Sequence, residues 1–350
     1  MPATPTFSPG FVYGPKAVEL LSYANENDFA IPLLTVNTTS AINAALEAAA
    51  AAGSPIALQF DLGGAAFFAG AGLTDADHHA STVGAVAAAL YVHTMAKAYG
   101  VPVLLGTDGV TSENKSWLDG LLQAGADFFH HRGFPLFTWH RVDMSDLPFE
   151  ENLTATKAFL RQTSSMHMHL VVSLGTAAQM ENRAEEPVDE IDDLPSPVVF
   201  ARGFEELHSV SPDFVFSPVP RKLSPEQRRQ ILTLLPTIIK NAQEYIRVKF
   251  NLADALPLLF TSFIRRDTQP EDIRSAIKNG AVVLNVDQVT HDALWEGVGT
   301  FVSEHADKTG DVDDIDNHYT NPAQWMRAGE KALIARLASI FEVAGAVGRL

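Results

Sequence analysis

Residues 31–64 read IPLLTVNTTSAINAALEAAAAAGSPIALQFDLGG, and this stretch contains one complete strand–helix–strand unit of the kind that decides the fold. A short apolar run, Ile31–Val36, precedes an alanine-rich segment, Ser40–Ala52, and a second apolar run, Pro55–Phe60. Short apolar runs bounded by turn residues favour buried strands, whereas the longer segment favours a helix that begins at Ser40. This alternation is typical of βα units around a parallel sheet.

The same pattern continues along the chain and predicts eight strands in all. The six further apolar runs are Val101–Gly106, Leu136–Asp143, Met168–Leu174, Phe214–Pro218, Leu256–Thr261 and Ala281–Val286. The further expected helices are Pro15–Asn27, Thr82–Tyr99, Ser116–Ala124, Pro148–Thr163, Pro225–Lys249 and Pro270–Asn279, with the tail Asn321–Gly345 closing the ring. Eight strands alternating with helices predict an α/β fold of the (β/α)8 TIM barrel type. No internal repeat or linker interrupts the pattern, so residues 1–350 are predicted to form a single domain.

Composition limits the functions open to the chain. Lys and Arg number 25 against 42 Asp and Glu, for a net charge of -17, so we expect neither nucleic acid nor a membrane as a partner. Because cysteine is absent, thiolate catalysis and cysteine-based metal sites are excluded. The N-terminus has no signal-peptide pattern, and no apolar run reaches about 18 residues. A soluble, cytoplasmic protein is predicted.

Two acidic segments lack apolar periodicity. The first, Glu181–Leu194, predicts a mobile surface loop over about residues 176–200, and the second covers Asp311–Asp316. Clustered carboxylates of this kind could bind a divalent ion, but a solvated loop is the favoured interpretation.

Six blocks, in order along nearly the whole chain, carry a resemblance to a known family. They are AINAALEAAA, QFDLGGAAFFAGAG, VPVLLGTDG, WLDGLLQAGADFF, VVLNVD and WMRAGEKALIARL. These blocks closely resemble the corresponding segments of class II fructose-bisphosphate aldolases. The resemblance implies the barrel fold and a homodimer, although a shared fold does not by itself imply a shared function.

The resemblance also implies a catalytic zinc ion held by three histidines, which polarises the ketone and stabilises the enediolate. In this sequence the three ligand positions hold Gly109, Ser224 and Thr261, and none of these residues is a histidine. Where the family carries a pair of glutamates, this chain has Val171 and Ser173. We therefore expect no metal site and no cofactor.

The phosphate-binding features that the resemblance implies have changed as well. Asp61 stands where the family has a serine beside the substrate, and the family's Gly-Ser phosphate loop is replaced by SFIRRD. An aspartate would repel a phosphate group. Arg265 and Arg266 could supply a new anion clamp, or they could be surface charges.

Several residues match the family's functional positions. Asp108, at the end of a predicted strand, corresponds to the general acid/base residue, and Glu181 corresponds to an acidic residue that shuttles the proton at the enediol carbon. Asn285 and Asp287 match the substrate-binding Asn-x-Asp run. Arg327 matches an arginine that reaches substrate across the dimer, although structural roles could also retain these residues.

Other polar residues fall at predicted strand ends. Thr35, Ser173 and Thr261 are candidate substrate-binding residues, together with Arg265, Asn285, Asp287 and Arg327, while His140 and Asp143 are candidate pocket lining. Alternation in SMHMHLVVS places His167 and His169 on the barrel interior with Val171 and Ser173. The pair could bind a metal, but buried, hydrogen-bonded histidines are the favoured interpretation.

Two functions from different classes follow from these observations. The first is a metal-independent, repurposed aldolase-like enzyme for a small, non-phosphorylated and apolar metabolite, such as one of secondary metabolism. In that mechanism Asp61 and Asp108 form an acid/base pair for lyase, cyclase or isomerase chemistry. The alternative is a non-catalytic pseudo-aldolase that binds a metabolite or a protein. A genuine zinc-dependent fructose-bisphosphate aldolase is the least favoured interpretation.

Overall fold

The computed structural model describes residues 7–175, 197–217, 237, 240–252, 258–260, 269–306 and 318–350. Nine parallel strands lie in these ranges. They are β1 (Gly10–Phe11), β2 (Ile31–Thr35), β3 (Ile56–Phe60), β4 (Pro102–Val110), β5 (Trp139–Asp143), β6 (His169–Ser173), β7 (Phe214–Phe216), β8 (Leu258–Phe260) and β9 (Ala281–Asn285). All eight predicted strands are present, and β1 is an additional short strand that the hydrophobic pattern did not indicate.

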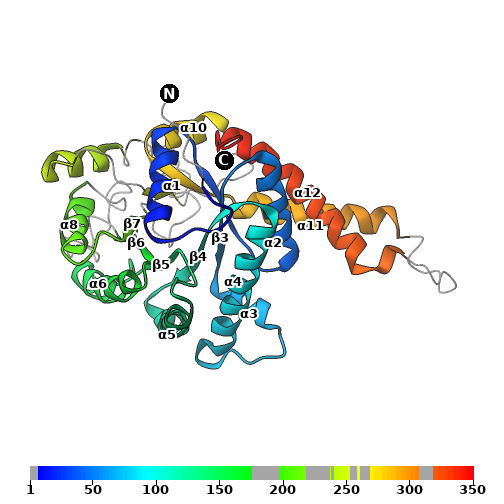
Figure 1. Ribbon diagram of the computed structural model, residues 1–350, viewed down its shortest axis with the longest axis horizontal. Helices are drawn as coiled ribbons and strands as arrows, with labels where there is room; N and C mark the ends of the chain where they lie inside the picture. The colour runs from blue at the N-terminus through cyan, green and yellow to red at the C-terminus, as the bar shows by residue number, and fades with distance from the viewer. Residues whose placement is uncertain are drawn as a thin grey trace, which may run out of the picture.

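Strands β2 to β9 form a closed ring (Figure 1). Each strand pairs with the next in sequence, and β9 returns to pair with β2, with Leu33 opposite Asn285. The extra strand β1 pairs with the start of β4, ahead of the point where β5 joins it. The predicted (β/α)8 barrel is thereby confirmed. Because all strands run in the same direction, their carboxyl ends share one rim, where polar side chains can gather.

Helices surround the ring (Figure 1). They are α1 (Gly14–Glu26), α2 (Thr39–Ala52), α3 (Leu62–Ala69), α4 (His79–Tyr99), α5 (Lys115–Arg132), α6 (Phe149–Ser165), α8 (Pro197–His208), α10 (Pro270–Lys278), α11 (Asp287–Glu304) and α12 (Pro322–Val343). Short 3₁₀ turns cover Ala76–His78, Ser112–Asn114 and His318–Thr320. Of the predicted helix Pro225–Lys249, residues 240–250 are helical and most of the earlier part lies outside the described residues.

Three helices in the described ranges were not expected from the sequence. In α3, Gly63 and Gly64 disfavour a helix, but the helix packs so closely on α4 that a Cβ at Gly84 would lie 1.9 Å from a backbone oxygen of Ala65. Helix α8 includes residues 197–200, which were predicted to belong to the mobile loop; the rest of that loop, 176–196, lies outside the described residues. Helix α11 follows β9 with only Val286 between them.

The start of α2 also differs from expectation. The N-cap is Thr38 rather than Ser40, because the Thr38 hydroxyl accepts a hydrogen bond from the Ala41 amide at 3.1 Å. Both Thr38 and Ser40 have hydroxyl side chains that can cap a helix. The tertiary structure determines that Thr38 is the residue that does so.

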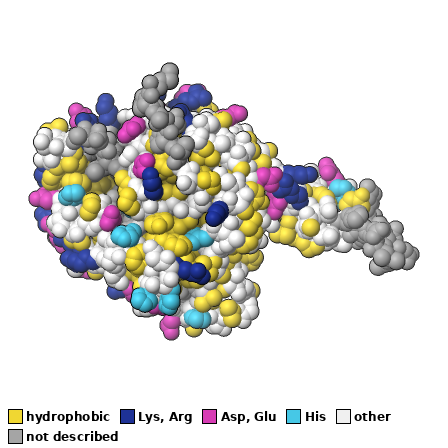
Figure 2. All heavy atoms as spheres, viewed as in Figure 1, with side chains coloured by type: hydrophobic (Ala, Val, Ile, Leu, Met, Phe, Trp, Pro, Cys, Tyr) yellow, Lys and Arg dark blue, Asp and Glu magenta, His cyan; other side chains and the backbone are white. Residues whose placement is uncertain are grey.

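Helices α11 and α12 form an arm that projects from one side of the barrel (Figure 1). Hydrophobic side chains lie among the polar ones on its visible surface (Figure 2). Within the arm, Trp295 of α11 is 74% exposed. No helix in the described ranges has the length and apolarity needed to cross a membrane.

Candidate active site

Asp108 lies near the end of β4, at the carboxyl rim of the barrel. Its carboxylate accepts a hydrogen bond from the Gly109 amide at 2.7 Å and forms an ion pair with Arg141, whose Nη1 lies 3.1 Å and 3.3 Å from the two carboxylate oxygens. Gln59 Nε2 donates a longer hydrogen bond of 3.4 Å. The side chain of Asp108 is 15% exposed, so the carboxylate is held firmly while one part of it remains open to solvent.

Arg141 is the main residue of this site that the sequence did not indicate. It lies in β5, whose five residues are all buried, and its guanidinium joins Asp108 to Ser217 after β7, with Nη2 donating to Ser217 Oγ at 3.2 Å. A basic residue within a buried strand was the available signal. Burial of a guanidinium is costly unless a carboxylate faces it, and Asp108 meets that requirement.

Asp287, Thr35 and Asn285 come together on the neighbouring part of the rim. Asp287 accepts hydrogen bonds from the backbone amide of Thr35 at 2.5 Å, from its hydroxyl at 2.7 Å and from Asn285 Nδ2 at 2.9 Å. Burial raises the pKa of Asp287 above its ordinary value, although the bonds from Thr35 and Asn285 act in the opposite direction. These three predicted substrate-binding residues therefore form one cluster.

Gln59 connects this cluster to Asp108. Its Nε2 donates to Thr35 Oγ1 at 2.9 Å and lies 3.4 Å from an oxygen of Asp108. The side chain is fully buried in β3. A continuous polar network thus crosses the mouth of the barrel from Asp287 through Thr35, Gln59, Asp108 and Arg141 to Ser217. Gln59 was another residue that the sequence analysis did not single out.

Asp61 forms a helix cap in the structure. Its side chain accepts a hydrogen bond from the Gly64 amide at 2.6 Å and caps the N-terminus of α3. Asp108 is held by Arg141 instead. The structure therefore gives the two carboxylates separate partners, rather than a shared contact of the kind an acid/base pair would use.

The remaining strand-end residues are buried. Asp143 accepts hydrogen bonds from the amide and hydroxyl of Ser145, and Ser173 Oγ has no hydrogen-bond partner among the described residues. The ring of His140 bonds to the Thr107 hydroxyl at 2.7 Å, and burial lowers the pKa of His140 to about 3, so this ring is neutral at pH 7.

The two histidines of SMHMHLVVS do not form a pair. His167 lies in the turn before β6, exposed and with a positive φ of 60°, so its predicted place on the barrel interior is wrong. His169 is buried at the start of β6, and burial lowers its pKa. Neither of its ring nitrogens has a hydrogen-bond partner in the described part of the chain.

Four predicted site residues lie away from this network or outside the described ranges. Arg327 of α12 binds both oxygens of Glu47 on α2, at 2.7 Å and 2.8 Å, and also contacts Glu330. Thr261, Arg265 and Glu181 fall outside the described residues.

The described residues do not offer the ligands of a three-histidine zinc site. No cluster of three His, Cys, Asp or Glu side chains suited to a metal occurs in those ranges. Gly109 has no side chain, and the cation beside Asp108 is the guanidinium of Arg141. Ser224 and Thr261 fall outside the described ranges, and neither residue is an imidazole ligand.

A closed parallel barrel with a polar network at its carboxyl rim defines an enzyme-type TIM barrel. A family model described as Fructose-bisphosphate aldolase class-II matches residues 16–206. The chain belongs to the class II fructose-bisphosphate aldolase family.

Individual relatives are similar over nearly the whole chain. The fructose-bisphosphate aldolase of Haemophilus influenzae is 34% identical and that of Escherichia coli K12 is 33% identical, with 95% and 97% of both chains covered, respectively. The crystal structure of the fructose-bisphosphate aldolase from Campylobacter jejuni superposes with a TM-score of 0.86 at 30% identity, covering 98% of this chain and 97% of that one.

These relatives overturn the functional prediction made from the sequence. Proteins about one third identical over almost the full length are named fructose-bisphosphate aldolases, which supports an aldolase and not a metal-independent, repurposed enzyme or a pseudo-aldolase. The prediction gave too much weight to the missing histidines and too little to the similarity of the whole chain. The family indicates a lyase with a small-molecule substrate.

Proposed function

We propose that this chain is an aldolase that cleaves and forms the carbon–carbon bond of a phosphorylated ketose. The names of its relatives indicate fructose bisphosphate as the first substrate to test. The observation that carries the proposal is the position of Asp108, a partly open carboxylate at the carboxyl rim held by Arg141 and Gly109. This is the part of a TIM barrel from which catalytic groups act.

Aldol cleavage requires a base for the hydroxyl proton beside the breaking bond, and an acid for the reverse direction. Asp108 is assigned this role, since its carboxylate is oriented by a guanidinium and remains accessible. Arg141 acts as a positioning residue that fixes the orientation of Asp108. Its positive charge also lies close to the rim, where the enediolate would develop negative charge.

The surrounding cluster is proposed to bind the substrate. Asn285 and Asp287, with Thr35 and Ser173, provide donors and acceptors suited to sugar hydroxyls. Asp61, Glu181, Thr261, Arg265 and Arg327 remain predicted site residues. Because the described residues do not fit a three-histidine zinc site, no step of this proposal is assigned to a metal ion.

The test is cleavage of fructose 1,6-bisphosphate by the purified chain, with and without added zinc. Asp108→Asn is expected to reduce kcat by about 100-fold or more, whereas Asp127→Asn, an exposed control on α5, should leave kcat unchanged. Cleavage by Asp108→Asn at the wild-type rate would remove Asp108 from the mechanism. A wild-type protein that is inactive under both metal conditions would overturn the proposed substrate.

We further propose that the chain forms one domain and assembles as a homodimer. The exposed Trp295 on the projecting arm supports an assembly in which a second copy covers this surface. Trp295→Glu should then yield a monomer in sedimentation analysis, and a dimer that persists would exclude the arm as the interface. A cytoplasmic location and the lack of nucleic-acid binding remain predictions from the sequence.

A further inference from the structure

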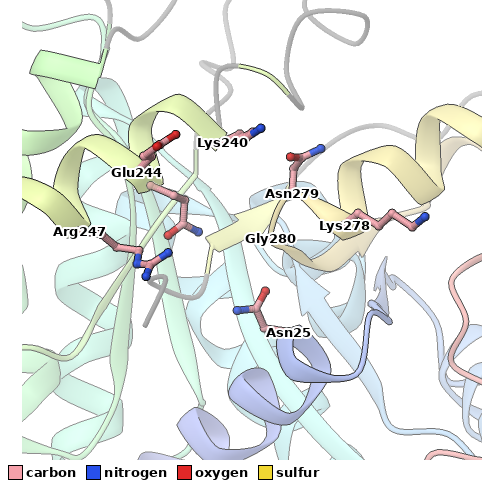
Figure 3. A pocket seen from close by; sticks show the side chains of 8 residues that line it. Asn25, Lys240, Glu244, Arg247, Lys278, Asn279 and Gly280 are labelled. Carbon is pink, nitrogen blue, oxygen red and sulfur yellow. The ribbon is translucent and has the colours of Figure 1, made fainter. Parts of the chain in front are cut away.

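A cavity lies at the opposite end of the barrel from Asp108. It has a volume of about 470 Å³ and lies among three segments: the end of α1, the helix of residues 240–250, and the turn from α10 into β9 (Figure 3). Its lining residues are Asn25, Lys240, Gln243, Glu244, Arg247, Lys278, Asn279 and Gly280. Gly280 precedes β9 and Asp287 follows it, so a strand of five residues, about 15 Å long, separates this cavity from the mouth.

The charge of this cavity is opposite to that of the whole chain. Three of its lining side chains are cationic and one, Glu244, is anionic, whereas the full sequence has a net charge of -17. The cations come from separate elements, with Lys240 and Arg247 on one helix and Lys278 at the end of α10. In a chain this acidic, a cation-rich cavity creates a local attraction for anions against a repulsive background.

The spacing of these residues gives the helix a polar face toward the cavity. Lys240, Gln243, Glu244 and Arg247 recur at intervals of three and four residues, which places them on one stripe of the helix. The buried residues Ala242 and Ile246 belong to another stripe. The polar stripe therefore faces the cavity, while the apolar one supports the helix.

The floor of the cavity is formed by the polar side chain of Gln243 and by Gly280. No side chain larger than that of glycine fits at position 280. Gln243 is 7% exposed, and its Nε2 would lie 3.0 Å from a Cβ built at Gly280. Gly280 also has a φ of 100°, which strongly favours glycine. Figure 3 shows Asn25 rising toward the cavity from the end of α1, and Arg247 approaching from the facing helix. The amides and the cations together can donate many hydrogen bonds.

We propose that this cavity is a binding site for a small phosphate-bearing anion. Lys240 and Arg247 provide charge-assisted hydrogen bonds to phosphate oxygens, and the amides of Asn25 and Gln243 provide neutral ones. The volume exceeds that of a single phosphate group, so an organic phosphate or a pyrophosphate group suits the cavity better than inorganic phosphate. The site is separate from the proposed catalytic mouth and does not depend on the reaction assigned to it.

The experiment measures binding of inorganic pyrophosphate to the full chain by isothermal titration calorimetry at constant ionic strength. The pocket variant is Lys240→Gln/Arg247→Gln. The control variant is Lys331→Gln/Arg336→Gln on α12, which removes the same two charges outside the cavity. We expect the pocket variant to raise Kd by at least about tenfold, because a hydrogen bond to a charged group contributes about a factor of ten or more in affinity. The control should bind like the wild type.

Three results would overturn the proposal. These are no binding to the wild type, equal binding by the pocket variant, and an equal loss of affinity in the control, which would show a nonspecific effect of net charge. Circular dichroism establishes that each variant is folded. If the double variant does not fold, the single change Lys240→Gln is measured instead, and wild-type affinity in that variant would count against the site.

Discussion

Replacement of Arg141 by Met is expected to lower the free energy of unfolding by about 3 kcal/mol. The side chains of Arg141 and Asp108 are 5% and 15% exposed, so removal of the guanidinium leaves a largely desolvated carboxylate. Loss of one partner from a buried ion pair costs about 3–5 kcal/mol. The lower end applies here because the Gly109 amide and Gln59 still donate to Asp108.

Urea unfolding of four proteins measures this effect: the wild type, Arg141→Met, Asp108→Asn and the double variant. In the double variant the charge of Asp108 is gone, so the two losses should not add, and a coupling energy of about 2 kcal/mol is expected. Arg202→Met is the matched control, because Arg202 is 48% exposed and its ion pairs with Glu150 and Glu206 should contribute at most about 1 kcal/mol. Additive losses, or a cost for Arg141→Met no larger than that of the control, would refute the reasoning.

Two further predictions concern packing and pH. Gly106→Ala should lower the free energy of unfolding by about 3 kcal/mol in urea titration, because the new Cβ would lie 2.0 Å from Nε1 of the buried Trp139. The control Gly72→Ala should cost far less, because a Cβ at Gly72 meets nothing within 4 Å. Equal losses in the two variants would contradict this packing. His140 has its pKa lowered to about 3 from 6.5 by burial, so its contribution to stability is complete above about pH 6.5 and is lost as the pH falls toward 3. His140→Gln should flatten the decline of the free energy of unfolding between pH 7 and 4, whereas His79→Gln, a change at an exposed histidine, should not. An unchanged slope of unfolding free energy against pH in His140→Gln would show that the ring is not held neutral.

The fold was largely readable from the sequence because its signal is local and repeated. Every residue of β2, β3 and β9 is buried, so these runs need no alternation of apolar and polar residues and appear as continuous stretches. Of the helices that were missed, α3 had a weak local signal. In α3, two glycines conceal a helix that the Asp61 cap and close packing on α4 stabilise.

The candidate site was only partly readable, because side chains from distant strands create it. Asp108, Thr35, Asn285 and Asp287 were identified from their positions at strand ends and from the family resemblance. The partner of Asp108 was not: Arg141 lies 33 residues away in sequence, and only the pairing of β4 with β5 brings it to the carboxylate. The helix cap that Asp61 forms was not predicted either, because a side chain's hydrogen-bond partner cannot be read from its residue type.

The sequence by itself determined the strand–helix alternation, the net negative charge and the absence of histidine at Gly109, since each of these is a property of residue order or composition. The tertiary structure alone decided which carboxylate is paired with a cation and which caps a helix. It also decided that Lys240 and Arg247 line one cavity with Lys278. These outcomes depend on distances between residues far apart in the chain, which closure of the barrel fixes and local sequence does not encode.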